Sequence, residues 1–429
     1  NEIENPSLVN LRDMRLKYMY EQMIKDPAVK LKLADNYAGV ANYWKFFDGE
    51  TKQLKKFNTY EQKQDYENKF TSWAKGKSEY ETLMAEYAQN YAAWTPYSKL
   101  RQYMNEGVVG SPLIAHAAGL ISLEDKLLKN NTPAADLKKA TDAATANRKG
   151  FLEHEDLPSD EKILAAVCMM FYNDIDKSQH PIGFYEALKA NYGDLKDEAT
   201  YKKWAHDVFS KTMILDETKW NAFVANPDAA ALQADPAFAF ASAFVKNYNT
   251  KYAPLYTQFV NRNNELGRSY MKGIMEMNPA AVNKMYPDAN FSMRVSYGNV
   301  KSYRPRDAVF YDYVCTAKGI LEKYVPGDYE FDLPAKQIEL LKKRDFGQYI
   351  DKTKNDLVVT FITTNDITGG NSGSPVIDAN GNLLGLAFDG NYEALSHKIA
   401  FGNDLKRIRC LEVLCVVWGI GKLGGAKNI

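Results

Sequence analysis

The sequence predicts an α+β fold, in which a large, irregular α-helical domain over residues 1–288 precedes a smaller β-rich domain over residues 289–429. Two observations lead to this division. Apolar residues recur every three or four positions through most of the first domain, which is the spacing of amphipathic helices. After residues 279–287 the pattern changes to short alternating or β-branched runs between turn-forming residues, which is typical of strands.

The first domain is expected to be a series of helices separated by proline, glycine, asparagine and aspartate. One helix is predicted over residues 6–25, and an Asp-Pro pair then caps a second helix that reaches about Phe47. Thr59 begins a third helix, as the first residue of a capping box, and the helical pattern continues to Tyr97. Further helices are predicted over residues 98–130, 134–154, 159–173, 182–191, 197–213, 216–225, 229–248 and 252–277.

The second domain is expected to contain short strands and one helix. A strand is predicted over residues 291–298, because apolar and polar residues alternate there. The segment 407–418 is apolar enough to be a closing helix or a strand, and the pattern leaves both open. Other strands are predicted at about 308–313 and at 357–364, 376–377 and 383–388, and the helix at 335–345.

Composition excludes several classes of partner. The chain has 429 residues, enough for two or three domains, and its 54 basic and 54 acidic residues cancel, so no nucleic acid or anionic membrane surface is expected to attract it. The sequence contains no run of about 18 apolar residues, so we expect no membrane span. The start at Asn1 is not a signal peptide, and we expect a processed or truncated chain.

No cofactor and no metal are expected, since the cysteines have neither the spacing nor the histidine partners of zinc ligands. Burial as free thiols is the favoured role for Cys168, Cys410 and Cys415, although the last two could pair with something.

A glycine-rich loop, Gly-Gly-Asn-Ser-Gly-Ser-Pro, lies between two predicted strands and carries Ser372. A serine that attacks a carbonyl creates an oxyanion, which needs backbone N–H groups already pointing at it. Glycines on both sides allow the amides of Gly370 and Ser372 to converge there. The loop differs from the nucleophile elbow of α/β-hydrolases, because position 374 is serine and a strand follows. The alternative is a structural glycine-rich hairpin loop.

The stretch TNDITGGNSGSPV over residues 364–376, with GLAFD over residues 385–389, resembles the bacterial dipeptidyl-peptidases 7 and 11 of serine peptidase family 46. Residues 35–45 and 293–298 extend the resemblance, which covers essentially the whole chain. It implies part of a chymotrypsin-like double β-barrel, with the helical domain as an insertion that covers the cleft. It also implies release of dipeptides from peptides with a free N-terminus, in the periplasm or at the surface of a Gram-negative bacterium. A homodimer is one possible assembly.

The resemblance assigns roles residue by residue. Ser372 is the expected nucleophile, with Gly370 contributing to the oxyanion hole, and Asp389 is expected to hold the α-ammonium group of the substrate. Acidic-specific members carry an arginine after that aspartate, whereas this chain has Gly390, which favours an apolar or broad P1 preference. Thr368 is expected to line the pocket wall.

The chain also departs from the family pattern. The catalytic histidine and aspartate of the family lie upstream, and no segment here matches those regions, so we expect a removed or separate N-terminal part. His397 follows the hairpin, but the base of chymotrypsin-like enzymes comes from the other barrel.

Three alternatives stay open. A non-catalytic peptide-binding or partner-binding protein could keep the serine loop without a base. Asp366, six residues before Ser372, could select a basic P1 residue in an endopeptidase, or it could be a turn residue. Asp389 could simply close a turn at a strand end.

Overall fold

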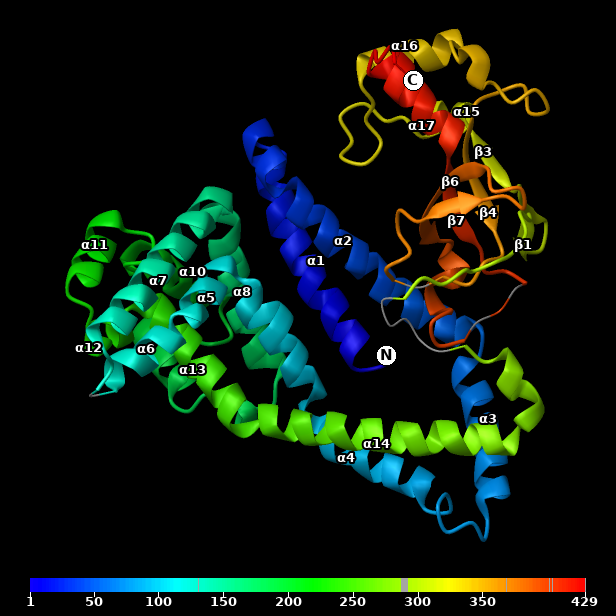
Figure 1. Cartoon of the computed structure of the whole chain (residues 1–429). Coiled ribbons are helices and arrows are strands. Elements are labelled where there is room, and N and C mark those ends of the chain that lie inside the picture. The colour runs from blue at the N-terminus through cyan, green and yellow to red at the C-terminus, as the bar shows by residue number, and fades with distance from the viewer. Residues whose placement is uncertain (130, 287–291, 368, 401, 403, 429) are drawn as a thin grey trace. The chain divides into compact units, whose positions relative to one another are not determined.

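The computed structural model describes residues 1–129, 131–286, 292–367, 369–400, 402 and 404–428 (Figure 1). The chain divides into two compact units. The helical unit comprises Asn1–Thr51 and Glu61–Met285, and the sheet unit comprises Lys52–Tyr60 and Tyr286–Ile429. The domain boundary predicted between residues 288 and 289 lies outside the described residues.

The helical unit follows much of the amphipathic pattern. The helices predicted over residues 134–154 and 252–277 are confirmed by α7 (Ala134–His154) and α14 (Ala253–Met277). The other helices are α1 (Glu4–Met23), α2 (Pro27–Lys56), α3 (Thr59–Ala74), α4 (Leu83–Gln102), α5 (Pro112–Gly119), α6 (Ile121–Leu128), α8 (Leu157–Asp174), α9 (Phe184–Tyr192), α10 (Glu198–Lys211), α11 (Glu217–Ala225), α12 (Ala229–Ala234) and α13 (Pro236–Lys251). Helix α2 continues nine residues beyond the predicted end at Phe47, and its last turns belong to the sheet unit.

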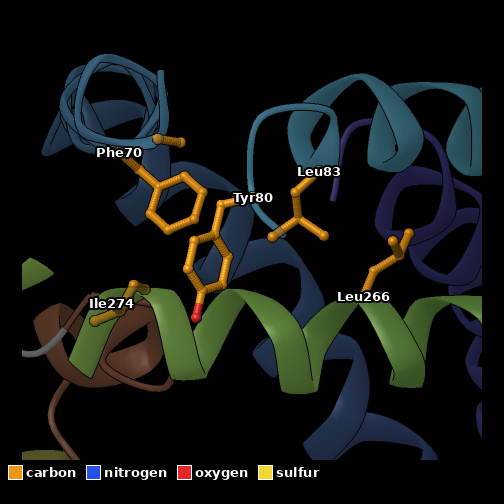
Figure 2. Packing of buried hydrophobic residues seen from close by; sticks show 6 residues of the cluster. Phe70, Tyr80, Leu83, Leu266 and Ile274 are labelled. Carbon is orange, nitrogen blue, oxygen red and sulfur yellow. The ribbon is translucent and has the colours of Figure 1, made fainter. Parts of the chain in front are cut away.

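The prediction of one helix from Thr59 to Tyr97 was wrong, because α3 ends at Ala74 and α4 begins at Leu83. Gly76 adopts a φ of +73°, which ends the helical path. The connecting turn carries Tyr80 back onto the ring of Phe70, with 6.2 Å between the ring centroids. Figure 2 shows this cluster, in which buried residues of α3, α4 and α14 meet. Burial of the ring therefore outweighs continuation of the helix.

Two other predicted helices are interrupted at caps. Within residues 98–130, two short helical turns separate α4 from α5, whose first turn is capped by the hydroxyl of Ser111, and α6 then follows. Within residues 229–248, Asp235 accepts hydrogen bonds from the first amides of α13 and so separates it from α12. In both places a capping residue immediately precedes a proline, which is a signal for the start of a helix. The apolar spacing continues across both sites, so the pattern alone predicted one longer helix.

The sheet unit contains two antiparallel sheets. A small one pairs β1 (Tyr303–Arg306) with β2 (Val309–Tyr311). The larger one has the order β3-β4-β7-β6-β5, formed by β3 (Val314–Thr316), β4 (Val358–Thr363), β7 (Ile408–Glu412), β6 (Leu383–Gly390) and β5 (Pro375–Ile377). The described strands thus form an open sheet with β3 and β5 at its edges, and the double barrel stays a prediction.

Two clusters form the core of this unit. One packs Phe361, Ile408 and Cys410 between the strands. The other gathers Leu357 and Trp418 with residues of the helices α15 (Ala317–Lys323), α16 (Ala335–Lys343) and α17 (Val413–Trp418). The segment 407–418 is therefore both of the predicted alternatives in succession, a strand followed by a helix.

The strand predicted over residues 291–298 was wrong for its described part, residues 292–298. Those residues run beside residues 364–366 and are held by side chains, for example by the hydroxyl of Ser296, which donates to the carbonyl oxygen of Asp366 over 2.6 Å. Their alternate apolar side chains are exposed, so the alternation does not reflect a buried sheet face.

The four cysteines are free thiols. Burial is confirmed for Cys168 and Cys410, whereas Cys415 is partly buried and Cys315 is exposed. Among the described helices no single one is long and apolar enough to cross a membrane, and one sharply bent pair, Leu83–Gly110 with Pro112–Leu128, meets the length and composition requirement.

Candidate active site

The serine loop connects β4 with β5 and is held by strand β6. The amide of Gly373 donates to the carbonyl oxygen of Ala387 over 2.7 Å, and the amide of Ala387 donates back to Ser374 over 3.0 Å. Gly370 and Gly373 have φ angles of +99° and +82°, which explains why glycine stands at both positions. Ser372 is exposed at the tip of this loop.

The hydroxyl of Ser372 donates to the main-chain carbonyl of Phe388, with 3.3 Å between the two oxygens. Phe388 lies at an irregularity of β6, where the register with β7 shifts between Ala387 and Asp389. Such a bulge turns a backbone group out of the regular ladder. The sheet therefore presents a carbonyl to the serine from the strand that also carries Asp389.

The amides of Gly370 and Ser372 have no hydrogen-bond partner among the residues that the structure describes. Free donors at these two positions are what an oxyanion hole requires. Their role as its two donors stays a prediction.

His397 is the one histidine in the sequence of the sheet unit. Its imidazole is largely buried beside the backbone of Ile367, and this burial lowers its pKa. Among the described residues, the hydroxyl of Ser372 donates to Phe388 and not to this imidazole. A serine needs an adjacent base to become a good nucleophile at neutral pH, and His397 does not supply one in this arrangement.

Asp389 is the penultimate residue of β6, and its side chain is 51% exposed. One carboxylate oxygen accepts the amide of Gly390 over 2.8 Å. The other accepts a guanidinium N–H of Arg409 over 2.9 Å. The carboxylate is thus oriented by two donors while half of its surface stays open to a ligand.

Gly390 has little free space around it. A Cβ atom built at this position would lie 3.0 Å from the Cβ of Ala394 and 3.8 Å from the carbonyl oxygen of Arg407. Any side chain here would push against Ala394. Close packing therefore favours glycine at this position, in addition to the fact that glycine brings no charged group.

The other predicted substrate residues have different outcomes. Thr368 lies outside the described residues. Asp366, the alternative determinant of a basic P1 residue, accepts a hydrogen bond from the hydroxyl of Tyr286. That carboxylate therefore already has a polar partner.

A buried polar network that the sequence did not indicate supports the end of β6. Arg407 is 1% exposed and donates to the carbonyl oxygens of Lys301, Ser302, Asp404 and Lys406. The side-chain oxygen of Asn391 accepts the amides of Ala394 and Arg407, and its amide group donates to Glu393. Burial raises the pKa of Tyr303, which donates to Glu393, to about 12. Full satisfaction of such a network favours one fixed conformation.

Arg409 is the other residue that sequence reasoning missed. It lies on β7, where Ile408 and Cys410 are buried and Arg409 between them is exposed. This alternation is a strand signal, and recognising it would have placed the arginine on a sheet face.

The described residues contain no group of three or more His, Cys, Asp or Glu side chains arranged to hold a metal ion. A cavity of about 630 Å³ lies in the helical unit beside α5, α6 and α7, and none of the predicted site residues lines it.

Comparison with known proteins identifies a family to which this chain is similar along its whole length. The family model described as Peptidase S46 matches residues 1–429. The Asp/Glu-specific dipeptidyl-peptidase of Flavobacterium psychrophilum is 35% identical, over 99% of this chain and 58% of its own length. Dipeptidyl-peptidase 7 of Capnocytophaga gingivalis is 33% identical, with the same coverage of 99% and 58%.

Among solved structures, the crystal structure of Porphyromonas endodontalis DPP11 in complex with the dipeptide Arg-Glu is similar in fold. The TM-score is 0.86 at 24% identity, over 99% of this chain and 59% of that one. The chain therefore spans less than two thirds of the length of these relatives.

Proposed function

Because this chain belongs to the peptidase S46 family, we propose that it carries the nucleophile and the N-terminal anchor of a serine dipeptidyl-peptidase. One observation carries the proposal. The exposed hydroxyl of Ser372 is hydrogen-bonded to Phe388, and the next residue of the same strand is the half-exposed carboxylate of Asp389. The proposed nucleophile is therefore hydrogen-bonded to the strand that carries the proposed anchor.

This arrangement suits removal of two residues at a time. The α-ammonium group of a peptide would pair with Asp389, and a charge-assisted hydrogen bond of this kind forms only at a free N-terminus. Two extended residues span ~7 Å, which sets how far the scissile carbonyl lies from the anchor. Binding energy at the anchor would thus select the second peptide bond for attack.

The proposed reaction follows the acyl-enzyme route. The Oγ of Ser372 forms a bond to the carbonyl carbon, and the free amides of Gly370 and Ser372 stabilise the oxyanion. The C–N bond breaks, the shortened peptide leaves with a proton, and water then hydrolyses the ester to release the dipeptide. The proposal assigns the base that takes the Ser372 proton to the part of the relatives' length that this chain does not span.

We propose an apolar or broad P1 preference. The names of the relatives do not separate the subtypes, since an Asp/Glu-specific enzyme and a dipeptidyl-peptidase 7 are similarly identical to this chain, at 35% and 33%. Support comes from Gly390, which offers no cation to a P1 carboxylate. The close approach of Ala394 also leaves an uncharged wall there.

Further parts of the proposal rest on family resemblance. These are the membership of the sheet in a chymotrypsin-like double barrel, the insertion of the helical unit into it, and a periplasmic or cell-surface location. A structure of the complete protein tests the first two, and immunoblotting of cell fractions tests the third. Light scattering after gel filtration tests the homodimer.

The central experiment uses a fluorophosphonate probe and peptide pairs on the complete protein that carries this chain. We expect labelling at Ser372, cleavage of free peptides two residues from the N-terminus, and no cleavage of their N-acetylated counterparts. Peptide binding without labelling would instead support a non-catalytic binding protein. Equal cleavage of free and acetylated peptides would indicate an endopeptidase.

A further inference from the structure

Arg409 makes three contacts with three consecutive residues of β6. Its Nη2 donates to the carboxylate of Asp389 over 2.9 Å, and its Nε donates to the carbonyl oxygen of Gly390 over 3.0 Å. Its guanidinium lies 5.6 Å from the centre of the Phe388 ring. The strand register places Arg409 directly opposite Asp389, so the contact is a cross-strand pair within the sheet.

We infer that Arg409 is a positioning residue for the substrate's N-terminus, because it fixes the carboxylate of Asp389 in the orientation that receives the α-ammonium group. The inference rests on the proposed function and deepens it. Nothing in the family pattern of the serine loop or of the segment GLAFD refers to position 409, which lies on a different strand.

The geometry favours orientation over a contribution to stability. The side chains of Arg409 and Asp389 are 45% and 51% exposed, and an ion pair this open to water stabilises a fold little. The planar guanidinium, however, bridges a side chain and a main-chain carbonyl at once, which fixes its own position. With the amide of Gly390 on the other oxygen, both carboxylate oxygens have a donor that defines their direction.

The geometry also separates Arg409 from a role in binding an acidic P1 side chain. A side chain at position 390 would point toward Ala394 and the carbonyl of Arg407. Side chains of neighbouring strand residues point to opposite faces, and Arg409 reaches the side chain of Asp389. Arg409 therefore lies on the face of the proposed anchor and not on the face that a side chain at 390 would occupy.

The test is steady-state kinetics on the complete protein with dipeptidyl substrates that have a free N-terminus. Arg409→Met removes the donors and keeps an apolar chain of similar length, whereas Arg409→Lys keeps the charge without the planar fork. Arg304→Met is the matched control, since Arg304 lies on β1 with its guanidinium over the Phe310 ring and outside the site. Asp389→Asn and the double variant with Arg409→Met complete a cycle.

For Arg409→Met we expect a KM about tenfold higher and a kcat within about twofold of the wild type, because a carboxylate without a fixed direction binds the ammonium less well. Arg409→Lys should recover part of the loss, and Arg304→Met should have no effect. In the Asp389→Asn background, Arg409→Met should add nothing. Fluorophosphonate labelling of Ser372 should stay at the wild-type rate in all Arg409 variants, since the probe has no N-terminus to anchor.

An unchanged KM in Arg409→Met would overturn the inference. A lower KM would overturn it as well, because it would show that the arginine only competes with the substrate for the carboxylate of Asp389. Equal losses of labelling and of peptide cleavage would overturn it too, because they indicate a structural defect. Failure of the proposed function has a different signature, in which wild-type protein is not labelled at Ser372 or Asp389→Asn does not raise KM, and the inference then falls with it.

Discussion

The hydroxyl of Ser372 donates to the carbonyl oxygen of Phe388, a residue sixteen positions later on the strand that also carries Asp389. In this arrangement the serine proton is directed toward the protein backbone. Attack on a substrate requires the hydroxyl to exchange that carbonyl for a base. The contact is therefore a resting arrangement of the proposed nucleophile.

Replacement of the nucleophile tests this directly. Ser372→Ala should abolish fluorophosphonate labelling and peptide cleavage, while the free energy of unfolding changes by less than about 0.5 kcal/mol, because the side chain is exposed. Ser374→Ala, in the same loop, is the control and should keep its labelling. Labelling that persists in Ser372→Ala would show that another residue reacts.

The P1 preference should change when a cation is introduced beside the anchor. Gly390→Arg combined with Ala394→Gly should raise kcat/KM for substrates with P1 Glu by about ten- to a hundredfold, the range of a charge-assisted pair. Gly390→Arg alone should raise kcat/KM for these substrates less, because a Cβ atom at position 390 would lie only 3.0 Å from the Cβ of Ala394. Ala394→Gly alone should leave the ratio of P1 Glu to P1 Leu cleavage unchanged. If the single variant equals the double, the crowding does not control this pocket.

The helical unit contains a buried acid that should make its stability depend on pH. Asp160 is 0% exposed and accepts the amide of Leu113 over 2.8 Å, and burial raises its pKa from 3.8 to about 7. The folded state thus binds a proton that the unfolded state releases between pH ~4 and ~7, so this stabilisation is complete below pH ~4 and is lost as the pH rises to ~7. Burial raises the pKa of the neighbouring Glu155 as well, which acts in the same direction.

Asp160→Asn should flatten this dependence, since the amide oxygen still accepts from Leu113 and no longer titrates. Thermal unfolding at pH 5 and pH 8 measures the effect. Between these two values, wild-type protein should lose on the order of 2 kcal/mol more stability than the variant. The comparison with the variant removes the opposite contribution of His116 and His180, whose pKa values burial lowers. Equal slopes in the two proteins would contradict the assignment.

Two glycines of helix α14 should respond to alanine in opposite ways. A Cβ at Gly273 would lie 2.7 Å from the ring of Phe70, so Gly273→Ala should destabilise the helical unit by about 1–3 kcal/mol through overpacking of the cluster in Figure 2. At Gly267 the nearest atom, the hydroxyl oxygen of Tyr87, is at 3.6 Å, an ordinary contact. Gly267→Ala should therefore be neutral or stabilising by up to about 1 kcal/mol. Urea unfolding of both variants separates packing from helix propensity.

Sequence patterns predicted the helices best where a regular apolar spacing follows a residue that interrupts the preceding helix. Helix α7 begins and ends at the predicted residues, and Pro133 immediately precedes it. The break between α3 and α4 was missed because Tyr80 continues the apolar spacing while its ring packs backward on Phe70. Only tertiary contacts distinguish those two roles of one aromatic residue.

The loop of the candidate site was predictable from the sequence. The two arginines that hold the neighbouring strands, Arg407 and Arg409, were not. The glycines around Ser372 mark the loop because positive φ angles require them. Arg409 and Arg407 act through pairing with strands more than fifteen residues away in sequence, and short-range patterns carry no information on which strands become neighbours. The same limit left the segment 407–418 undecided between strand and helix.

Strand β7 (Ile408–Glu412) lies between β4 and β6, although it follows both in the chain. During synthesis on the ribosome, the serine loop and the anchor strand emerge before the strand that joins their supports. The sheet that aligns them can close only once residues 408–412 have left the exit tunnel. Nascent chains that stop short of this point would hold Ser372 in a loop whose neighbouring strands β4 and β6 are not yet joined by β7.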